Sequence, residues 1–205
     1  QLDSLKTFVL TLFAFLPELV LLNFSLFIVF YAVFVWNGSK TSFTDRALLL
    51  ARLITWARWV TVSIFLIYGL FWNFCCLASS TRYFFVDQFI FDWPVFVLKL
   101  LILIALFYIL AMSRTYMLAG SHQSFGYEFL IILLLACSGS LLVASAYDFL
   151  SLYVAIELQA LAFYVLAAFK TDSELSTEAS IKYFIVGAFA SIVLLLGISF
   201  VYGAA

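Results

Sequence analysis

A glutamate and a lysine set within long apolar stretches are the residues of this chain best placed to do chemistry. Glu157 and Lys182 each stand inside an apolar run long enough to cross a bilayer. A charge near the middle of the hydrocarbon costs roughly 2.5 to 3.5 kcal/mol on insertion scales, so it usually faces a partner or water. A glutamate that gains and loses a lysine partner can change its protonation state. The two residues therefore predict a proton path through a membrane.

Glu157 is predicted to lie near the bilayer midplane. In a helix over residues 149–169 it is about 12 Å from the helix start and about 18 Å from the helix end. Tyr153 and Tyr164, at i−4 and i+7, share its face, so their hydroxyls could hydrogen-bond the carboxylate or hold water. The alternative is a glutamate held in a permanent structural pair. Asp148, which precedes this helix, is predicted at the outer mouth of any path.

Lys182 is expected closer to the membrane surface. It lies about six residues into a helix over residues 177–202, roughly 9 Å from the inner surface. Its depth then differs from that of Glu157 by about 9 Å, so water or another side chain would have to link the two. The alternative is that Lys182 snorkels to the inner interface and takes no part in a path.

The remaining charges are expected to be structural. Lys99 is predicted to snorkel, and Glu18 and Arg58, near the ends of predicted helices, need only interfacial solvation. His122 is expected on the surface of a Gly/Ser loop. No metal or cofactor site is predicted on this chain, because its three cysteines form no CxxC motif and it has no GxGxxG motif and no haem-type pair of histidines.

The composition of the chain indicates the class of protein to which it belongs. The chain is 67% hydrophobic and 10% charged, whereas soluble domains carry about 25% charged residues. Unbroken apolar runs exclude the alternating segments of a closed barrel. We therefore predict an all-α polytopic membrane protein, and nothing indicates nucleic acid as a partner. The six expected helices form a single transmembrane domain over residues 1–205 and lie at about 16–36, 55–77, 95–112, 127–146, 149–169 and 177–202.

The connections carry the orientation signal. Six Lys and Arg residues lie in or beside odd-to-even connections and two on the other side, which predicts that both termini are outside.

The aromatic segment from Ala78 to Asp92 is expected at an interface. Ser176 is the expected N-cap of the last helix, with Glu178 in its first turn. Gly187 and Ser191 are expected to allow close packing of this helix.

The residues from Phe129 to Tyr202 resemble a known family. The runs SAYDFLSLYVAIELQALAFYVLAAFK and SELSTEASIKYFIVGAFAS are similar to subunit 2 of respiratory complex I, the NADH:ubiquinone oxidoreductase, and the earlier LPELVLLN resembles the first helix of that subunit. The resemblance implies the N-terminal part of an antiporter-like fold. It also implies that Glu157 and Lys182 belong to the charged axis through which protons cross the membrane arm, while quinone reduction occurs elsewhere.

The resemblance further implies partners and a location. FMN, iron–sulfur clusters and quinone are expected on other subunits, and the partners are other membrane-arm subunits and lipids. Family members continue for several more helices, which predicts a split subunit whose remaining helices come from a separate chain. The 25 Phe and 11 Tyr favour an AT-rich organelle genome and hence the mitochondrial inner membrane, with both termini on the intermembrane-space side. Two alternatives remain open, a subunit of a multisubunit cation/proton antiporter and a non-conducting structural half-subunit.

Overall fold

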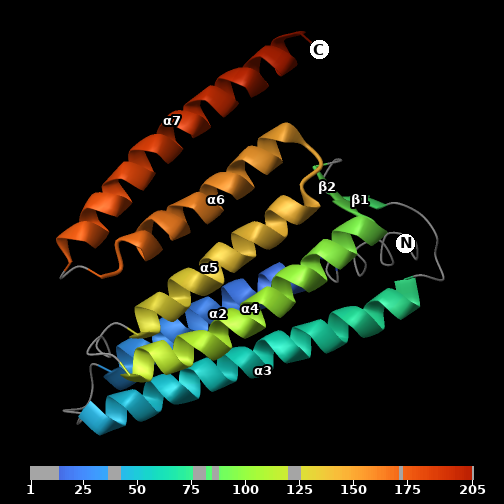
Figure 1. Ribbon diagram of the computed structural model, residues 1–205. Coiled ribbons are helices and arrows are strands. Elements are labelled where there is room, and N and C mark those ends of the chain that lie inside the picture. Colours follow the sequence, from blue (N-terminus) through green and yellow to red (C-terminus); the bar gives the residue numbers. More distant parts are fainter. Residues whose placement is uncertain are drawn as a thin grey trace.

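Six long helices and one short hairpin make up the computed structural model, which describes residues 14–36, 43–75, 82–84, 88–119, 126–170 and 173–204 (Figure 1). In chain order the elements are α2 (Leu16–Tyr31), the π-helix η1 (Ala32–Trp36), α3 (Phe43–Cys75), β1 (Arg82–Phe84), β2 (Phe89–Phe91), α4 (Trp93–Ala119), α5 (Gly126–Ser145), α6 (Phe149–Ala167) and α7 (Glu174–Ala204). All six helices are long and apolar enough to cross a membrane. The predicted fold class, an all-α polytopic membrane protein of about six spans, is confirmed.

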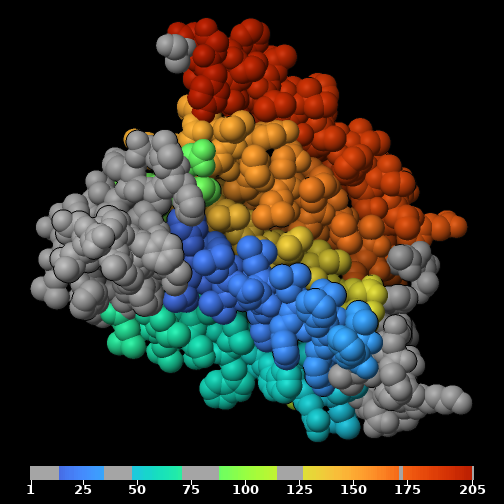
Figure 2. Space-filling model, turned by 180° about the vertical axis from the view of Figure 1, so that it is seen from behind, coloured from blue at the N-terminus to red at the C-terminus, as the bar shows by residue number. Residues whose placement is uncertain are grey.

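The helices are stacked in layers on α5. Helix α5 packs against α2, α4 and α6, and half of its apolar span is buried. Its leucines join a core with residues of α2, α3 and α4, among them Leu21, Ile54 and Leu103. Helix α7 lies outside α6 at the edge of the bundle, and a view from behind shows it along α6 on the side away from α2 and α3 (Figures 1 and 2). Only 6% of its span is buried, so the sixth helix has little of its surface covered by this chain.

Helix ends follow local sequence signals. Pro17 and Pro94 lie in the first turns of α2 and α4, where a missing N–H costs no helical hydrogen bond. Helix α7 begins at Glu174, earlier than expected, and the Ser173 side-chain oxygen accepts a 3.4 Å bond from the Ser176 N–H. Ser173 is therefore the N-cap, and the prediction of Ser176 was wrong. The Ser176 hydroxyl instead donates to the Ala167 carbonyl at 2.8 Å and so caps the end of α6.

Two helices differ in length from the apolar runs that predicted them. Helix α3 begins at Phe43, about 12 residues before the expected start, and α4 continues to Ala119. Hydropathy detects only the part of a helix that suits lipid. Polar residues such as Arg52 and Arg114 are good helix formers and carry both helices beyond that part.

The hairpin is attached to the turn between α5 and α6. Strands β1 and β2 are antiparallel, with Tyr83 opposite Ile90. The Gln88 carbonyl, at the start of β2, accepts bonds from the Tyr147 N–H at 2.9 Å and the Ser151 hydroxyl at 3.0 Å. The aromatic segment expected at an interface is thus, in its described residues, a hairpin. Its place is the same end of the bundle as the start of α6 (Figure 1).

Candidate functional site

Glu157 lies near the centre of α6. Along the helix it is about 12 Å from Phe149 and about 15 Å from Ala167. The side chain is half-buried, and within the described part of the chain it has no hydrogen-bond or ion-pair partner. A carboxylate that is unpaired in the middle of an apolar helix needs water or a group from another molecule.

Tyr164 shows which way this face of α6 points. Its ring lies edge-on to those of Tyr183 and Phe184 on α7, with centroids 5.0 and 5.4 Å away. Because Tyr164 is seven residues after Glu157, both lie on the side of α6 that faces α7. The Glu157 carboxylate therefore belongs to the α6–α7 side of the molecule, which is the least covered.

Lys182 is bound to its own helix. Its ammonium group donates to Glu178 one turn earlier, in an ion pair whose side chains are 72% and 60% exposed. Glu178 lies in the second turn of α7, whereas the first turn holds Glu174, so the prediction that placed Glu178 in the first turn was wrong. Lys182 and Glu157 are not in contact.

Asp148 links the start of α6 to the end of α7. It precedes α6 in an extended backbone conformation, and its carboxylate accepts a hydrogen bond from the Tyr202 hydroxyl near the end of α7. No side-chain cap bond to α6 is made. Asp148 thus connects α7 to the start of the helix that carries Glu157.

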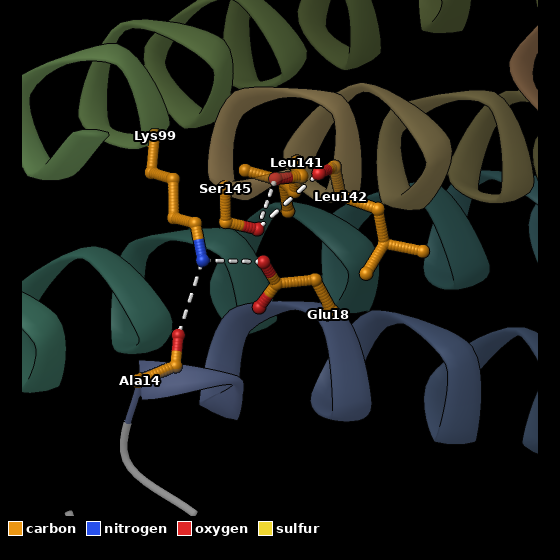
Figure 3. A network of polar contacts seen from close by, with 6 residues as sticks. All are labelled: Ala14, Glu18, Lys99, Leu141, Leu142 and Ser145. Atoms are coloured by element: carbon orange, nitrogen blue, oxygen red, sulfur yellow. Dashed lines mark hydrogen bonds and ion pairs between the residues drawn. The ribbon is translucent and has the colours of Figure 1, made fainter. Parts of the chain in front are cut away.

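The most enclosed charges belong to another pair, which sequence reasoning missed. Lys99 of α4 and Glu18 of α2 form an ion pair with Nζ and Oε1 2.6 Å apart, and their side chains are 1% and 3% exposed (Figure 3). The Lys99 ammonium also donates to the Ala14 carbonyl at 3.1 Å and lies 5.5 Å from the centroid of the Phe15 ring. The predictions that Lys99 snorkels and that Glu18 is solvated at the interface were therefore wrong.

The Glu18 carboxylate is held by its ion pair with Lys99 and not by hydrogen bonds to described residues. Neither oxygen has a hydrogen bond of ordinary geometry to a described residue, and Oε1 is held by the ion pair alone. Ser145 of α5, drawn beside the pair in Figure 3, donates instead to the carbonyls of Leu141 and Leu142 at 3.2 and 3.3 Å. The buried Oε2 atom of the carboxylate is thus left without a protein donor in the described part of the chain.

A third charge also lies deeper than expected. Because α3 runs from Phe43 to Cys75, Arg58 is close to its middle and not near its end. Its guanidinium lies over the Phe107 ring of α4 at 4.9 Å from the centroid. Interfacial solvation alone was therefore the wrong expectation for Arg58.

Across the described residues no group of three His, Cys, Asp or Glu side chains could hold a metal ion.

A known family model matches the C-terminal part of the chain. Residues 146–205 match the family model described as NADH:quinone oxidoreductase/Mrp antiporter, TM. This matched region contains Asp148, Glu157 and Lys182, but neither Glu18 nor Lys99.

Longer matches extend over nearly the whole chain. The chain is 37% identical over 189 residues to NADH-quinone oxidoreductase subunit N of Rhodobacter capsulatus, covering 92% of this chain and 36% of that protein. It is 33% identical over 190 residues to NADH-ubiquinone oxidoreductase chain 2 of Marchantia polymorpha, covering 93% of this chain and 37% of that protein. The fold matches a chain of respiratory complex I from Thermus thermophilus with a TM-score of 0.67 and 23% identity, over 92% of this chain and 37% of that one.

The chain therefore spans little more than a third of the length of these relatives. The resemblance read from the sequence is confirmed within that span: this chain is related to part of the antiporter-like membrane subunit called N in bacterial NADH-quinone oxidoreductases and chain 2 in NADH-ubiquinone oxidoreductases.

Proposed function

We propose that this chain is part of a proton-translocating membrane-arm subunit of a respiratory NADH:quinone oxidoreductase, and that Glu157 takes up and releases the transported proton. The observation that carries the proposal is the half-buried, unpaired carboxylate of Glu157 in the middle of α6. A carboxylate locked in a salt bridge would be a poor proton carrier, whereas one with no partner in its own chain is free to exchange a proton with water or with a group of another molecule. The family match over this helix supports the assignment.

Lys182 is proposed as the next group on the inner side. Its ion pair with Glu178 is not covered by this chain, so water or a group of a neighbouring chain can compete with Glu178 for the ammonium group. Because Glu157 and Lys182 are not in contact, a proton passing between them needs water or a side chain from another chain. Asp148, hydrogen-bonded by Tyr202, is proposed to mark the outer mouth of the same path.

Glu157→Gln tests the proposal. The amide keeps the size of the side chain but cannot bind a proton at neutral pH, so NADH-driven proton uptake into reconstituted vesicles should fall several-fold, normalised to assembled complex. Lys182→Met should be milder, because part of its role is an exposed pair. The matched control is Glu174→Gln, which makes the same change at an exposed position in the first turn of α7 and should leave pumping unchanged.

Unchanged proton uptake in Glu157→Gln would leave the chain as a non-conducting structural half-subunit. The description of the matched family also names the Mrp antiporters, so a cation/proton antiporter is the second candidate. Proton movement driven by a sodium or potassium gradient, without NADH or quinone, would favour that reading.

We also propose that the exposed face of α7 is covered by other membrane-arm subunits. Only Ser180 and Ile198 of this helix are buried by the chain itself. The relatives contain further sequence beyond the matched third, and helices formed by it, supplied by a separate chain, would cover α7 and bring a partner to Glu157. Identification of the chains that co-purify in mild detergent tests this partner. The proposed location is the mitochondrial inner membrane, with both termini on the intermembrane-space side.

A further inference from the structure

A groove runs along the outside of the bundle between α3 and α4. It consists of two adjoining hollows of about 330 and 310 Å³, which share Val62 of α3 and Phe107 of α4. The first hollow continues along apolar side chains such as Leu66 and Leu103. The second ends at Thr55, Arg58 and Trp59. The groove is therefore apolar along its length and basic at one end.

Two further arginines flank the basic end. Arg52 is three residues before Thr55 and seven before Trp59, so it lies on the stripe of α3 that lines the groove. Arg114 is seven residues after Phe107, on the stripe of α4 that forms the opposite wall. The two helices are antiparallel neighbours, and these spacings place both arginines beyond Arg58 at the same end of the groove.

These three cations have no acidic partner in the described part of the chain. The two ion pairs found there join Lys99 to Glu18 and Lys182 to Glu178. The Arg58 Nε atom is buried and has no hydrogen-bond acceptor among the described residues. Apart from its contact with the Phe107 ring, the Arg58 guanidinium has no ion-pair partner among the described residues and can bind an anionic ligand.

Depth places the arginines within reach of lipid headgroups. Tyr31 of α2 packs against Trp56 of α3, with ring centroids 6.0 Å apart. Since η1 ends at Trp36, five residues further on, Trp56 lies about 8 Å and Arg58 about 10 Å from the level at which η1 ends, while α3 itself continues past that level to Phe43. A flexible arginine side chain covers part of that distance by snorkelling. Arg52, which is six residues nearer the start of α3, lies about level with the end of η1, and Arg114 is the last residue of the apolar span of α4.

We propose that this groove, defined by Thr55, Arg58, Val62, Leu66 and Phe107, binds an anionic phospholipid. The headgroup phosphate sits among Arg52, Arg58 and Arg114, and an acyl chain lies along the apolar part between α3 and α4. Basic pockets between transmembrane helices on the positive-inside face are typical binding sites for anionic lipid headgroups. Guanidinium groups suit phosphate because each can donate two parallel hydrogen bonds. Charge complementarity selects an anionic lipid, and the apolar walls select a lipid over a free phosphate ion.

The test measures lipid binding to the full chain, purified in mild detergent with the chains that accompany it. After delipidation, phosphatidylglycerol or phosphatidylcholine is added back, and bound lipid is counted by native mass spectrometry. Phosphatidylglycerol should bind more tightly. Arg58→Gln and Arg114→Gln should each weaken its binding about fivefold, which corresponds to about 1 kcal/mol per arginine. Val62→Phe, which narrows the groove where the two hollows meet, should weaken it without removing charge.

Lys170→Gln is the matched control for charge, since Lys170 is an exposed cation after α6, away from the groove. This variant should bind phosphatidylglycerol like the wild type. A photoactivatable phosphatidylglycerol should also label peptides from α3 and α4. Equal binding of the two lipids, or arginine variants with unchanged lipid binding, would overturn the proposal. Loss of a co-purifying subunit in those variants without loss of lipid would show that the arginines meet a carboxylate of a partner protein instead.

Discussion

At the scale of single residues, the buried pair of Glu18 and Lys99 holds α2 to α4. The side chains are almost completely enclosed, so both charges have lost their hydration, and the pair repays that loss through direct attraction and the bond to the Ala14 carbonyl. Such a pair adds little net stability compared with a well-packed apolar pair. Removing one partner is different, because the other charge is then buried alone.

Single and double substitutions separate these two effects. Glu18→Met or Lys99→Met should each destabilise the folded chain by about 3 to 5 kcal/mol. The double substitution should recover most of this loss, because it leaves no unpaired charge. Unfolding by denaturant in detergent micelles measures all four species as a double-mutant cycle. Additive losses in the double variant would show that the two charges act separately and that the contact does not stabilise the fold.

A sequence is interpreted one charge at a time, which explains why Glu157 is predicted as a site and the pair of Glu18 and Lys99 is not. Glu157 was recognised because it stands alone in a long apolar run. Glu18 and Lys99 are 81 residues apart and looked like two independent interfacial charges. The available signal was that opposite charges lie near the starts of the first and third spans, which begin at the same membrane end. Their burial depends on how α2 and α4 both pack against α5, which hydropathy does not describe.

At the scale of elements, α6 and α7 meet at a glycine. A Cβ atom added to Gly187 would lie 2.0 Å from the Tyr164 hydroxyl oxygen, so the tyrosine side chain occupies the space that the missing side chain leaves. The predicted close packing at Gly187 thus occurs against an aromatic side chain and not against another small residue. Helices α5 and α6 approach still more closely, because a Cβ at Gly139 would lie 3.0 Å from the Gln159 backbone nitrogen.

Gly187→Ala should weaken the packing of α7 on α6. The Tyr164 ring must shift out of its contacts with Tyr183 and Phe184, and overpacking of this kind typically costs about 1 to 3 kcal/mol. Limited proteolysis of α7 in detergent should accordingly become faster. Adding Tyr164→Phe should restore part of the protection, because it removes the atom closest to the new methyl group.

The control lies on the same helix. Nothing stands within 4 Å of a Cβ added at Gly197, so Gly197→Ala should leave proteolysis unchanged or slower, since alanine is the better helix former. If both alanine variants behaved alike, helix propensity and not the contact with Tyr164 would govern the α6–α7 packing.

Elements were easier to predict than their ends and contacts. Six runs of apolar residues are sufficient to count six spanning helices, because each must satisfy its own backbone within lipid. The hairpin formed by β1 and β2 was not predicted, since hydropathy does not describe the backbone pairing of Arg82–Phe84 with Phe89–Phe91. Position alone predicts Ser176 as the cap of α7, whereas its hydroxyl donates to the Ala167 carbonyl at the end of α6.

At the scale of the whole molecule, burial falls from the centre of the bundle towards α7. Half of the α5 span is buried, against 11% for α6 and 6% for α7. The two helices that carry Glu157 and Lys182 are therefore the least covered by their own chain. The part of the molecule proposed to move protons is thus also the part most dependent on neighbours.

This gradient of burial predicts that another protein chain lies against α7 in the native membrane. A photo-crosslinking residue placed at Ile192, which is 63% exposed, should form crosslinks to another protein chain. The same residue placed at Ile198, which is 9% exposed, should crosslink within this chain, because that side chain is already covered. Mass analysis of the crosslinked bands distinguishes the two cases. Lipid adducts alone at Ile192 would mean that α7 borders the bilayer, and the proposed path through Glu157 would then have no protein partner on that side.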